Sequence, residues 1–393
     1  MLGLGKIALA LKGSLIGGKL DALLTSPSIS TADLPVALPL TKPVLFKDIR
    51  ILAKAPYPLK QSVSALELAD VTDLGLTVVT GNSSMNVKGT VLDGHAKVTL
   101  TSLSVSTADL PVETGFKKPV DLKNLEVNAN VIGQAAQISN LSFQLFNGQV
   151  KADGGLVMES SAPPFRGKFT IHDLQVSPVL QALNPDSVVS LSGTAALALA
   201  VAGRGFSMPD LTRSLEGPGR LEVKDGKIEG VNLVQEAMAL LKVAGIQVDQ
   251  GKATAFSSIE TDVLIKQGAV RVQKFLMDGH EFQATGSGTV GFDQTLNLAV
   301  NLSLRQDLSR KIAGSSSLIK LALKDGRLTV PLRITGSAQN PSYGLDMRWL
   351  TGIVQEQAQE KVKEAVGGLL KGTTKPEDLK QQGRDLIKGL FGR

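Results

Sequence analysis

The sequence predicts a mainly β protein, an elongated and mostly antiparallel sheet with a few short helices and a helical C-terminal tail. Three observations favour this fold class: apolar alternation, a content of 40 glycines against 17 prolines, and a long internal repeat. The alternation is clearest at 294–305. Strand side chains point to opposite faces in turn, so this segment has one apolar and one polar face. The apolar face carries Leu296, Leu298, Val300, Leu302 and Leu304.

The same alternation recurs along most of the chain, and the segments are separated by turn dipeptides such as Asp93-Gly94 and Asn147-Gly148. Such pairs supply the positive φ angles of tight hairpins, which predicts a meander of antiparallel strands. The further alternating segments are 87–91, 96–100, 137–143, 149–157, 191–201, 269–275, 288–292, 321–323 and 328–334. The other turn dipeptides are Asp225-Gly226, Gln267-Gly268, Asp278-Gly279 and Asp325-Gly326.

An internal repeat explains how the sheet becomes long. Ser-Thr-Ala-Asp-Leu-Pro-Val at 30–36 recurs at 106–112, and Lys-Pro-Val at 42–44 recurs at 118–120. The offset is 76 residues in both cases (30 to 106, 42 to 118). Such a repeat predicts that one supersecondary unit is built at least twice and laid side by side. We assign 27–139 to this β-repeat region.

Helical patterns are few in the body of the chain. Pro178 in the first turn predicts a short helix at about 177–184. Asn232 is a candidate N-cap, which predicts a helix over 233–243.

Both ends of the chain predict amphipathic helices. Lysines interrupt the apolar run of 1–26, which favours an amphipathic N-terminal helix; the alternative is the stub of a longer protein truncated upstream. The tail at 348–393 has an apolar stripe of helical spacing. It either caps the end of the sheet or contacts a membrane surface, for which its basic amphipathic end is typical. The membrane-contact residues would be Arg384, Leu386, Ile387, Lys388, Leu390 and Phe391.

Composition excludes several classes of function. The net charge of +6 comes from interspersed residues and aromatics make up only 4%, so no nucleic-acid footprint is predicted. Cysteine is absent, and His95, His172 and His280 lack metal-ligand spacing. No catalytic motif or carboxylate pair stands out, so the sequence predicts no enzyme, no metal and no cofactor. No uninterrupted apolar run reaches the length of about 18 residues that a membrane-spanning helix needs.

The apolar strand faces have two interpretations: a closed sandwich core, or an open groove that holds lipid acyl chains. The substitution Val300→Asp distinguishes the closed core from the open groove. In a groove it abolishes lipid loading and leaves the fold intact, whereas in a closed core it prevents folding. The candidate groove-lining residues are Leu296, Leu298, Val300, Leu302, Leu304, Val270, Val272, Leu321, Leu323, Leu328 and Val330.

Several segments resemble the AsmA family. Gly-Pro-Gly-Arg-Leu-Glu-Val-Lys-Asp-Gly-Lys-Ile-Glu-Gly-Val-Asn-Leu at 217–233 is similar to a family signature in which a strand and Asp-Gly lead into a helix. Residues 256–261 and 268–272 resemble the strands that follow it. The segment 325–341, with Val-Pro-Leu-Arg-Ile-Thr-Gly and a later proline, is similar to the closing motif of the family domain.

The resemblance implies that 140–347 form an AsmA-like C-terminal β domain. It implies a sheet curled into a trough (a β-taco) with an apolar interior, as in the related TamB-like and chorein-type bridge proteins. It also implies a location in the bacterial cell envelope, on the periplasmic side of the inner membrane. Members usually carry an N-terminal membrane helix. None is visible in this chain, so either an anchor is missing or an envelope protein partner supplies it.

We therefore expect a non-enzymatic envelope protein that holds and conducts phospholipid acyl chains along an apolar β groove between inner and outer membrane. Its partners would be phospholipids and a membrane surface. The alternative is a structural or assembly factor that supports outer-membrane protein or envelope biogenesis through its exposed edge strand.

Overall fold

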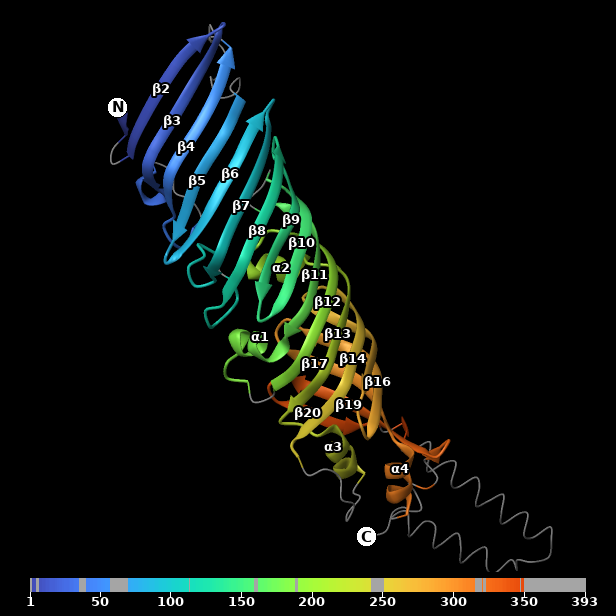
Figure 1. The fold of residues 1–393 in the computed structure, drawn as a ribbon. Coiled ribbons are helices and arrows are strands. Elements are labelled where there is room, and N and C mark those ends of the chain that lie inside the picture. The colour runs from blue at the N-terminus through green and yellow to red at the C-terminus, as the bar shows by residue number, and fades with distance from the viewer. Residues whose placement is uncertain are drawn as a thin grey trace, which may run out of the picture.

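A computed structural model gives the architecture of the chain, and it describes residues 2–4, 7–34, 40–56, 70–112, 114–158, 162–187, 190–241, 251–314, 320, 323–346 and 348–349. The strands form one long antiparallel sheet that stays open and is not closed into a barrel (Figure 1). Along its length the sheet twists, and toward the C-terminal strands it curls over on itself (Figure 1). The predicted fold class is confirmed.

Most strands pair with their neighbours in the sequence, so the sheet grows along one axis as a meander. The last long pairing joins β17 to β19, and β18 pairs with β19 alone. The strands are β1 Leu2–Leu4, β2 Ile7–Ile16, β3 Lys19–Ser30, β4 Leu45–Pro56, β5 Asp70–Thr80, β6 Ser83–Leu92, β7 His95–Ser106, β8 Asp121–Ile132, β9 Ala135–Leu145, β10 Gly148–Val157, β11 Pro164–Gln175, β12 Ser190–Arg204, β13 Gly217–Glu229, β14 Ala253–Lys266, β15 Ala269–Asp278, β16 Phe282–Gly291, β17 Thr295–Leu304, β18 Leu323–Lys324, β19 Arg327–Ser337 and β20 Pro341–Leu345.

The expected N-terminal helix at 1–26 is wrong, because this segment forms β1, β2 and the first part of β3. β2 and β3 pair from Ala10–Thr25 to Ile16–Lys19. The turn between them is Gly17-Gly18, with φ angles of 58° and 75°. Two glycines at positive φ favour a hairpin, and strand pairing then overrides the helix propensity of the Leu, Ala and Lys residues.

The turn dipeptides predict most hairpins, but Asp278-Gly279 joins β15 to β16 without a positive φ angle, and one dipeptide forms no turn. Asp93-Gly94, Gln267-Gly268 and Asp325-Gly326 all have positive φ and join neighbouring strands. Asp225-Gly226 instead lies inside β13. Asp225 has a φ of 48°, and the pairing with β12 shifts there, so the dipeptide forms a β-bulge.

Four short helices lie on the described part of the sheet: α1 (Val176–Leu183), α2 (Met208–Ser214), α3 (Leu233–Leu240) and α4 (Gln306–Ala313). α1 and α3 confirm the two helices expected from the sequence. The side chain of Asn232 accepts hydrogen bonds from the backbone N–H groups of Val234 and Gln235, as an N-cap does. α2 and α4 were not predicted, although Ser207 as N-cap and Pro209 in the first turn mark the start of α2. The helical tail expected at 348–393 lies almost wholly outside the described residues.

The 76-residue repeat builds the same local structure twice. The backbone N–H of Val44 donates to Thr31 Oγ1 over 2.9 Å, and that of Val120 donates to Thr107 Oγ1 over the same distance. The two connections also touch, since the backbone N–H of Thr41 donates to the carbonyl of Pro111 over 3.0 Å. The repeats therefore stack along one edge of the sheet.

The largest hydrophobic core closes the C-terminal end of the trough. α3 contributes Val234 and Ala237, and α4 contributes Ile312; these pack with the apolar faces of β16, β17 and β19. Side chains in this core are almost wholly shielded from water; the exposed fraction of Leu302 is 0%. The α3 and α4 helices thus plug this end of the sheet.

Ser309 fixes α4 in this plug. The buried Ser309 hydroxyl accepts a hydrogen bond of 2.9 Å from the backbone N–H of Leu328 and lies 2.9 Å from the carbonyl oxygen of Arg305. We expect Ser309→Ala to lower the free energy of unfolding by about 1–3 kcal/mol, because the Leu328 N–H loses its acceptor. Urea unfolding checks this, with exposed Ser287→Ala as the matched control. Equal stability of the two variants would contradict it.

Candidate functional site: an apolar groove

One face of the sheet carries an unbroken line of apolar residues. In the strand register Val87 lies between Leu76 and Leu100, and the line continues strand by strand to β19. Only apolar residues and glycines occupy it. We call it the inner row. Its members in order are Leu76, Val87, Leu100, Val127, Leu141, Ala152, Phe169, Leu199, Gly219, Val263, Val272, Gly288, Leu298 and Ile334.

The adjacent line on the opposite face is almost entirely polar. The sheet therefore has an apolar inner face and a polar outer face, as the alternation predicts. Strands lie about 4.8 Å apart, so the inner row runs roughly 60 Å along the trough. The outer line contains Thr77, Asn86, Thr101, Glu126, Ser142, Lys151, Thr170, Ala198, Arg220 and Asp262.

Packing against the C-terminal core divides the inner row into an open and a closed part. From Leu76 to Leu199 every member is half-buried, and none packs against that core. Beyond Val263, which is 9% exposed, the row is half-buried again, and Leu298 and Ile334 at its end pack against the core that contains α3 and α4. The open part of the row therefore spans β5 to β12.

Between β9 and β12 the inner face is hollowed into a cavity of about 520 Å³. This volume falls within the range of about 300–1,000 Å³ that is typical of small-molecule sites. Its lining is apolar except for Asp153 and Arg166, both exposed residues whose strand neighbours face inward. The lining residues are Ile138, Leu141, Ala152, Asp153, Gly154, Gly155, Leu156, Phe165, Arg166, Gly167, Phe169, Ile171, Leu197, Leu199, Val201, Phe206, Leu211 and Leu215.

The α2 segment closes one side of this cavity. The ring of Phe206, just before α2, stacks on Phe165 with a centroid distance of 5.2 Å. Leu211 and Leu215 complete that wall. Because Phe206 is still 61% exposed, it stands at the mouth of the cavity and not inside it.

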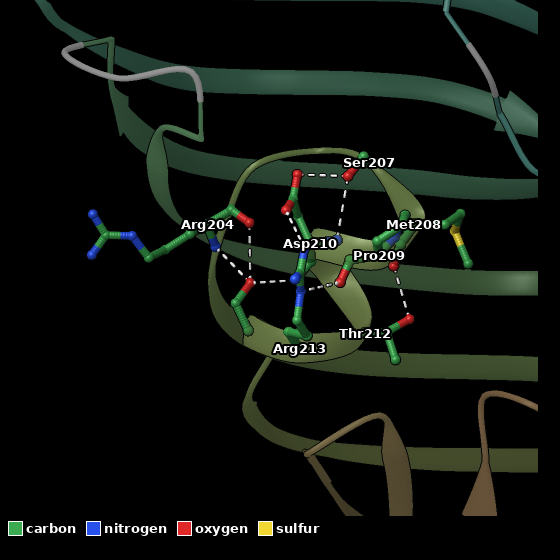
Figure 2. Close-up of polar contacts among 8 residues, drawn as sticks. Arg204, Ser207, Met208, Pro209, Asp210, Thr212 and Arg213 are labelled. Atoms are coloured by element: carbon green, nitrogen blue, oxygen red, sulfur yellow. Dashed lines mark hydrogen bonds and ion pairs between the residues drawn. The ribbon is translucent and has the colours of Figure 1, made fainter.

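A local polar network holds α2 in place (Figure 2). The Ser207 side chain accepts a hydrogen bond from the backbone N–H of Asp210, and Arg213 pairs with Asp210 over 3.2 Å. Ser214 Oγ accepts from the backbone N–H of Arg204 over 2.9 Å and donates to its carbonyl oxygen over 3.1 Å. These contacts tie α2 to the end of β12, whereas the cavity itself receives only apolar side chains from it.

Two glycines allow the strands to pass close beneath the cavity. A Cβ atom at Gly154 would lie 2.3 Å from the carbonyl oxygen of Arg166, and one at Gly167 would lie 3.2 Å from the ring of Phe169. A side chain at either position would therefore displace the strand or fill the hollow.

The residues predicted from the sequence to line the groove fall into two groups in the structure: some are buried in the closed core, and others are half-buried. Val300 is 6% exposed, and Leu302, Leu304, Leu328 and Val330 are 0% exposed. These five belong to the closed core and line no open groove in this structure. The remaining described residues are half-buried, and they are Leu296, Leu298, Val270, Val272 and Leu323. Leu321 and the proposed membrane-contact residues 384–391 lie outside the described residues.

The cavity residues themselves were not singled out from the sequence. The alternation at 191–201 predicts a strand with Leu197, Leu199 and Val201 on one face, and that signal was available. The sequence gives no such signal for the contribution of Phe206 and Leu211, because that contribution depends on how α2 folds back after β12.

The described residues bring no catalytic or metal-binding groups together. No cluster of three or more His, Asp or Glu side chains with metal-binding geometry occurs among them. His95, His172 and His280 are each exposed and lie on different hairpins. Nor does any described helix have the length and apolar character to cross a membrane.

An open antiparallel sheet with a continuous apolar inner face defines a groove-forming β protein. Residues 116–275 match the model of the AsmA family, and this range contains the whole cavity. Protein AsmA of Escherichia coli (strain K12) is 24% identical to this chain over 234 residues, which is 58% of this chain and 36% of that protein. These matches support membership of the AsmA family, which is not a known enzyme family. The chain thus aligns with about a third of the relative's length, and no solved structure matches it.

Proposed function

We propose that this protein holds phospholipid acyl chains against the inner face of its trough and lets them move along it. The observation that carries the proposal is the inner row, an apolar path roughly 60 Å long that no polar side chain interrupts. Transfer of hydrocarbon from water to apolar surface is favourable by about 25 cal/mol per Å². A uniform lining gives a chain similar binding energy at each position, so movement along the row meets no deep trap.

The cavity between β9 and β12 is the proposed resting site on this path. Here the inner face is hollowed, and Phe165 and Phe206 add aromatic surface. A lipid would lie with its acyl chain in the trough and its headgroup in water at the open side. This arrangement needs no cofactor and no catalytic group.

The family match supports a bacterial envelope protein, and we place this chain on the periplasmic side of the inner membrane. Transport between inner and outer membrane is our proposal for the trough. A membrane anchor or an envelope partner would position it there.

Photo-crosslinking along the inner row tests the proposal. We expect a photoreactive residue at Leu100, Leu141 or Leu199 to crosslink phospholipid that co-purifies with the protein. The same residue on the outer face, at Thr101, Ser142 or Ala198, should give none. These pairs are neighbours on the same strands, so each is a matched control.

The pattern of labelling decides between a path and a single site. Crosslinks at all three inner positions support movement along the row. Labelling at Leu199 alone would restrict the lipid to the cavity, and a protein without lipid at any position would overturn the proposal.

A second candidate function rests on β2. This strand pairs with β3 along Ala10–Ile16, and among the described residues only the short β1 lies on its other side, opposite Ile7–Leu9. Leu11 and Leu15 are 63% and 55% exposed there. An open edge of this kind accepts a strand from another protein, as an assembly factor would use it. Proline at Leu11, which removes a backbone donor, should abolish such a complex and leave lipid crosslinking at Leu199 unchanged.

A further inference from the structure

The two long edges of the trough differ in construction. One edge, which we call the loop rim, carries the repeat connections, α1, α3 and α4. Its parts bind one another: the backbone N–H groups of Lys117 and Lys118 both donate to the carbonyl of Ala182 in α1, over 2.8 and 3.1 Å. The other edge, which we call the hairpin rim, carries the tight turns after β2, β6 and β8 and the connection that contains α2. Its geometry is fixed by the register, in which Leu92, His95, Ile132 and Ala135 follow one another across β6 to β9.

Large apolar side chains stand exposed at several of the described reversals of the hairpin rim. Turns are usually built from polar or small residues, and a large apolar side chain at a turn has no sheet of its own to cover it. The exposed fractions are 68% for Ile16, 45% for Leu92, 55% for Ile132, 50% for Met158, 61% for Phe206 and 59% for Met208. Ile16, Leu92 and Ile132 lie at the turns that follow β2, β6 and β8. Phe206 and Met208 flank the start of α2.

Cations lie beside the first of these apolar residues and near the α2 pair. Lys19 lies opposite Ile16 across the first turn, and the guanidinium of Arg204 is directed away from α2 (Figure 2). The nearby carboxylate of Asp210 is already bound by Ser207 and Arg213. Apolar side chains with flanking cations are typical of surfaces that lie in the interfacial layer of a membrane.

The cavity opens on the same rim. Leu156 and Phe165 lie opposite each other next to the ends of β10 and β11, and Phe206 stands at the mouth beside them. A bilayer in contact with the hairpin rim would therefore place acyl chains next to this opening.

We infer that the hairpin rim docks on a phospholipid bilayer, so that acyl chains pass sideways into the cavity beside Phe206. The nature of the cargo in this inference rests on the proposed function. The docking rests on the exposed side chains of the rim.

Vesicle flotation with the purified full chain tests the docking. The rim variant carries Ile16→Ser, Leu92→Ser, Ile132→Ser and Met158→Ser. It leaves Phe206 and the cavity lining unchanged. The matched control carries four serines at exposed apolar residues of or near the loop rim: Leu103, Val112, Leu180 and Leu183. The vesicles are phosphatidylcholine, alone or mixed with phosphatidylglycerol.

We expect the rim variant to bind both kinds of vesicle at least about tenfold more weakly, because four apolar side chains no longer enter the interface. The control should bind as the wild-type chain does. Equal loss in both variants, or no binding by the wild-type chain, would overturn the inference. A change in oligomeric state of the rim variant with unchanged flotation would also overturn it, because the rim would then be a protein contact.

A fluorescent fatty acid in vesicle-free solution separates this inference from the proposed function. If the wild-type chain binds the probe but not vesicles, only the docking is wrong. If it binds vesicles but never the probe, the acyl-chain site is wrong and the docking remains.

Discussion

Val300→Asp should prevent the C-terminal part of the trough from folding. Val300 is 6% exposed and lies in the core that α3 and α4 close. A carboxylate there would be buried without a partner, which costs more than about 3 kcal/mol. We expect loss of β-sheet circular dichroism and rapid proteolysis of the region after β13. This outcome is the one that assigns Val300 to a closed core and not to an open groove.

Ala299→Asp is the matched control. Ala299 is the preceding residue on β17 and is exposed on the outer face, so the same charge there meets water. Its circular dichroism should equal that of the wild-type chain. A folded Val300→Asp protein that has lost its lipid would show that the plug opens and that the groove extends into β17.

Leu199→Asp should abolish lipid loading while the protein stays folded. Leu199 belongs to the inner row, lines the cavity and is half-buried, so an aspartate can keep contact with water in the empty trough. An acyl chain in the cavity would remove that water, and the charge would then be left in apolar surroundings. We expect at least about tenfold less co-purified phospholipid, as measured by lipid extraction and mass spectrometry.

Ala198→Asp provides the comparison for this variant. Ala198 is exposed on the outer face of β12, between Thr170 and Arg220. Its lipid content should not change. Equal lipid content in the two variants would mean that acyl chains do not occupy the cavity, and it would direct attention to the open edge of β2.

The two aspartate experiments also explain why the sequence misassigned part of the groove. Leu298 and Leu302 occupy the same face of one strand and look alike in the sequence, yet one is half-buried and the other is 0% exposed. Leu302 is a buried member of the core to which α4 contributes Leu308 and Ile312, whereas Leu298 packs at the margin of that core. α4 has only three apolar residues, Leu308, Ile312 and Ala313; their spacing suits one face of a helix, but so short a segment does not reveal in the sequence which strands it covers.

The N-terminal segment shows the same limit in another form. Its Leu, Ala and Lys residues favour a helix when taken alone, and pairing with β3 decides otherwise. Asp225-Gly226 has the composition of a hairpin turn but forms a bulge, because β12 and β14 pair on both sides of it.

The sequence by itself determined the fold class, the hairpin meander, the 76-residue repeat and the separation of an apolar from a polar face. Each of these depends on residues close together in the chain: alternation with period two, glycine at positive φ, and identity at a fixed offset. Only the tertiary structure decided where the apolar face stays open. That depends on which short helices fold back over which strands, as α2 does beside the cavity and α3 and α4 do at the closed end. Alternation places a side chain on a face, but whether that face is covered is set by packing between residues distant in the sequence.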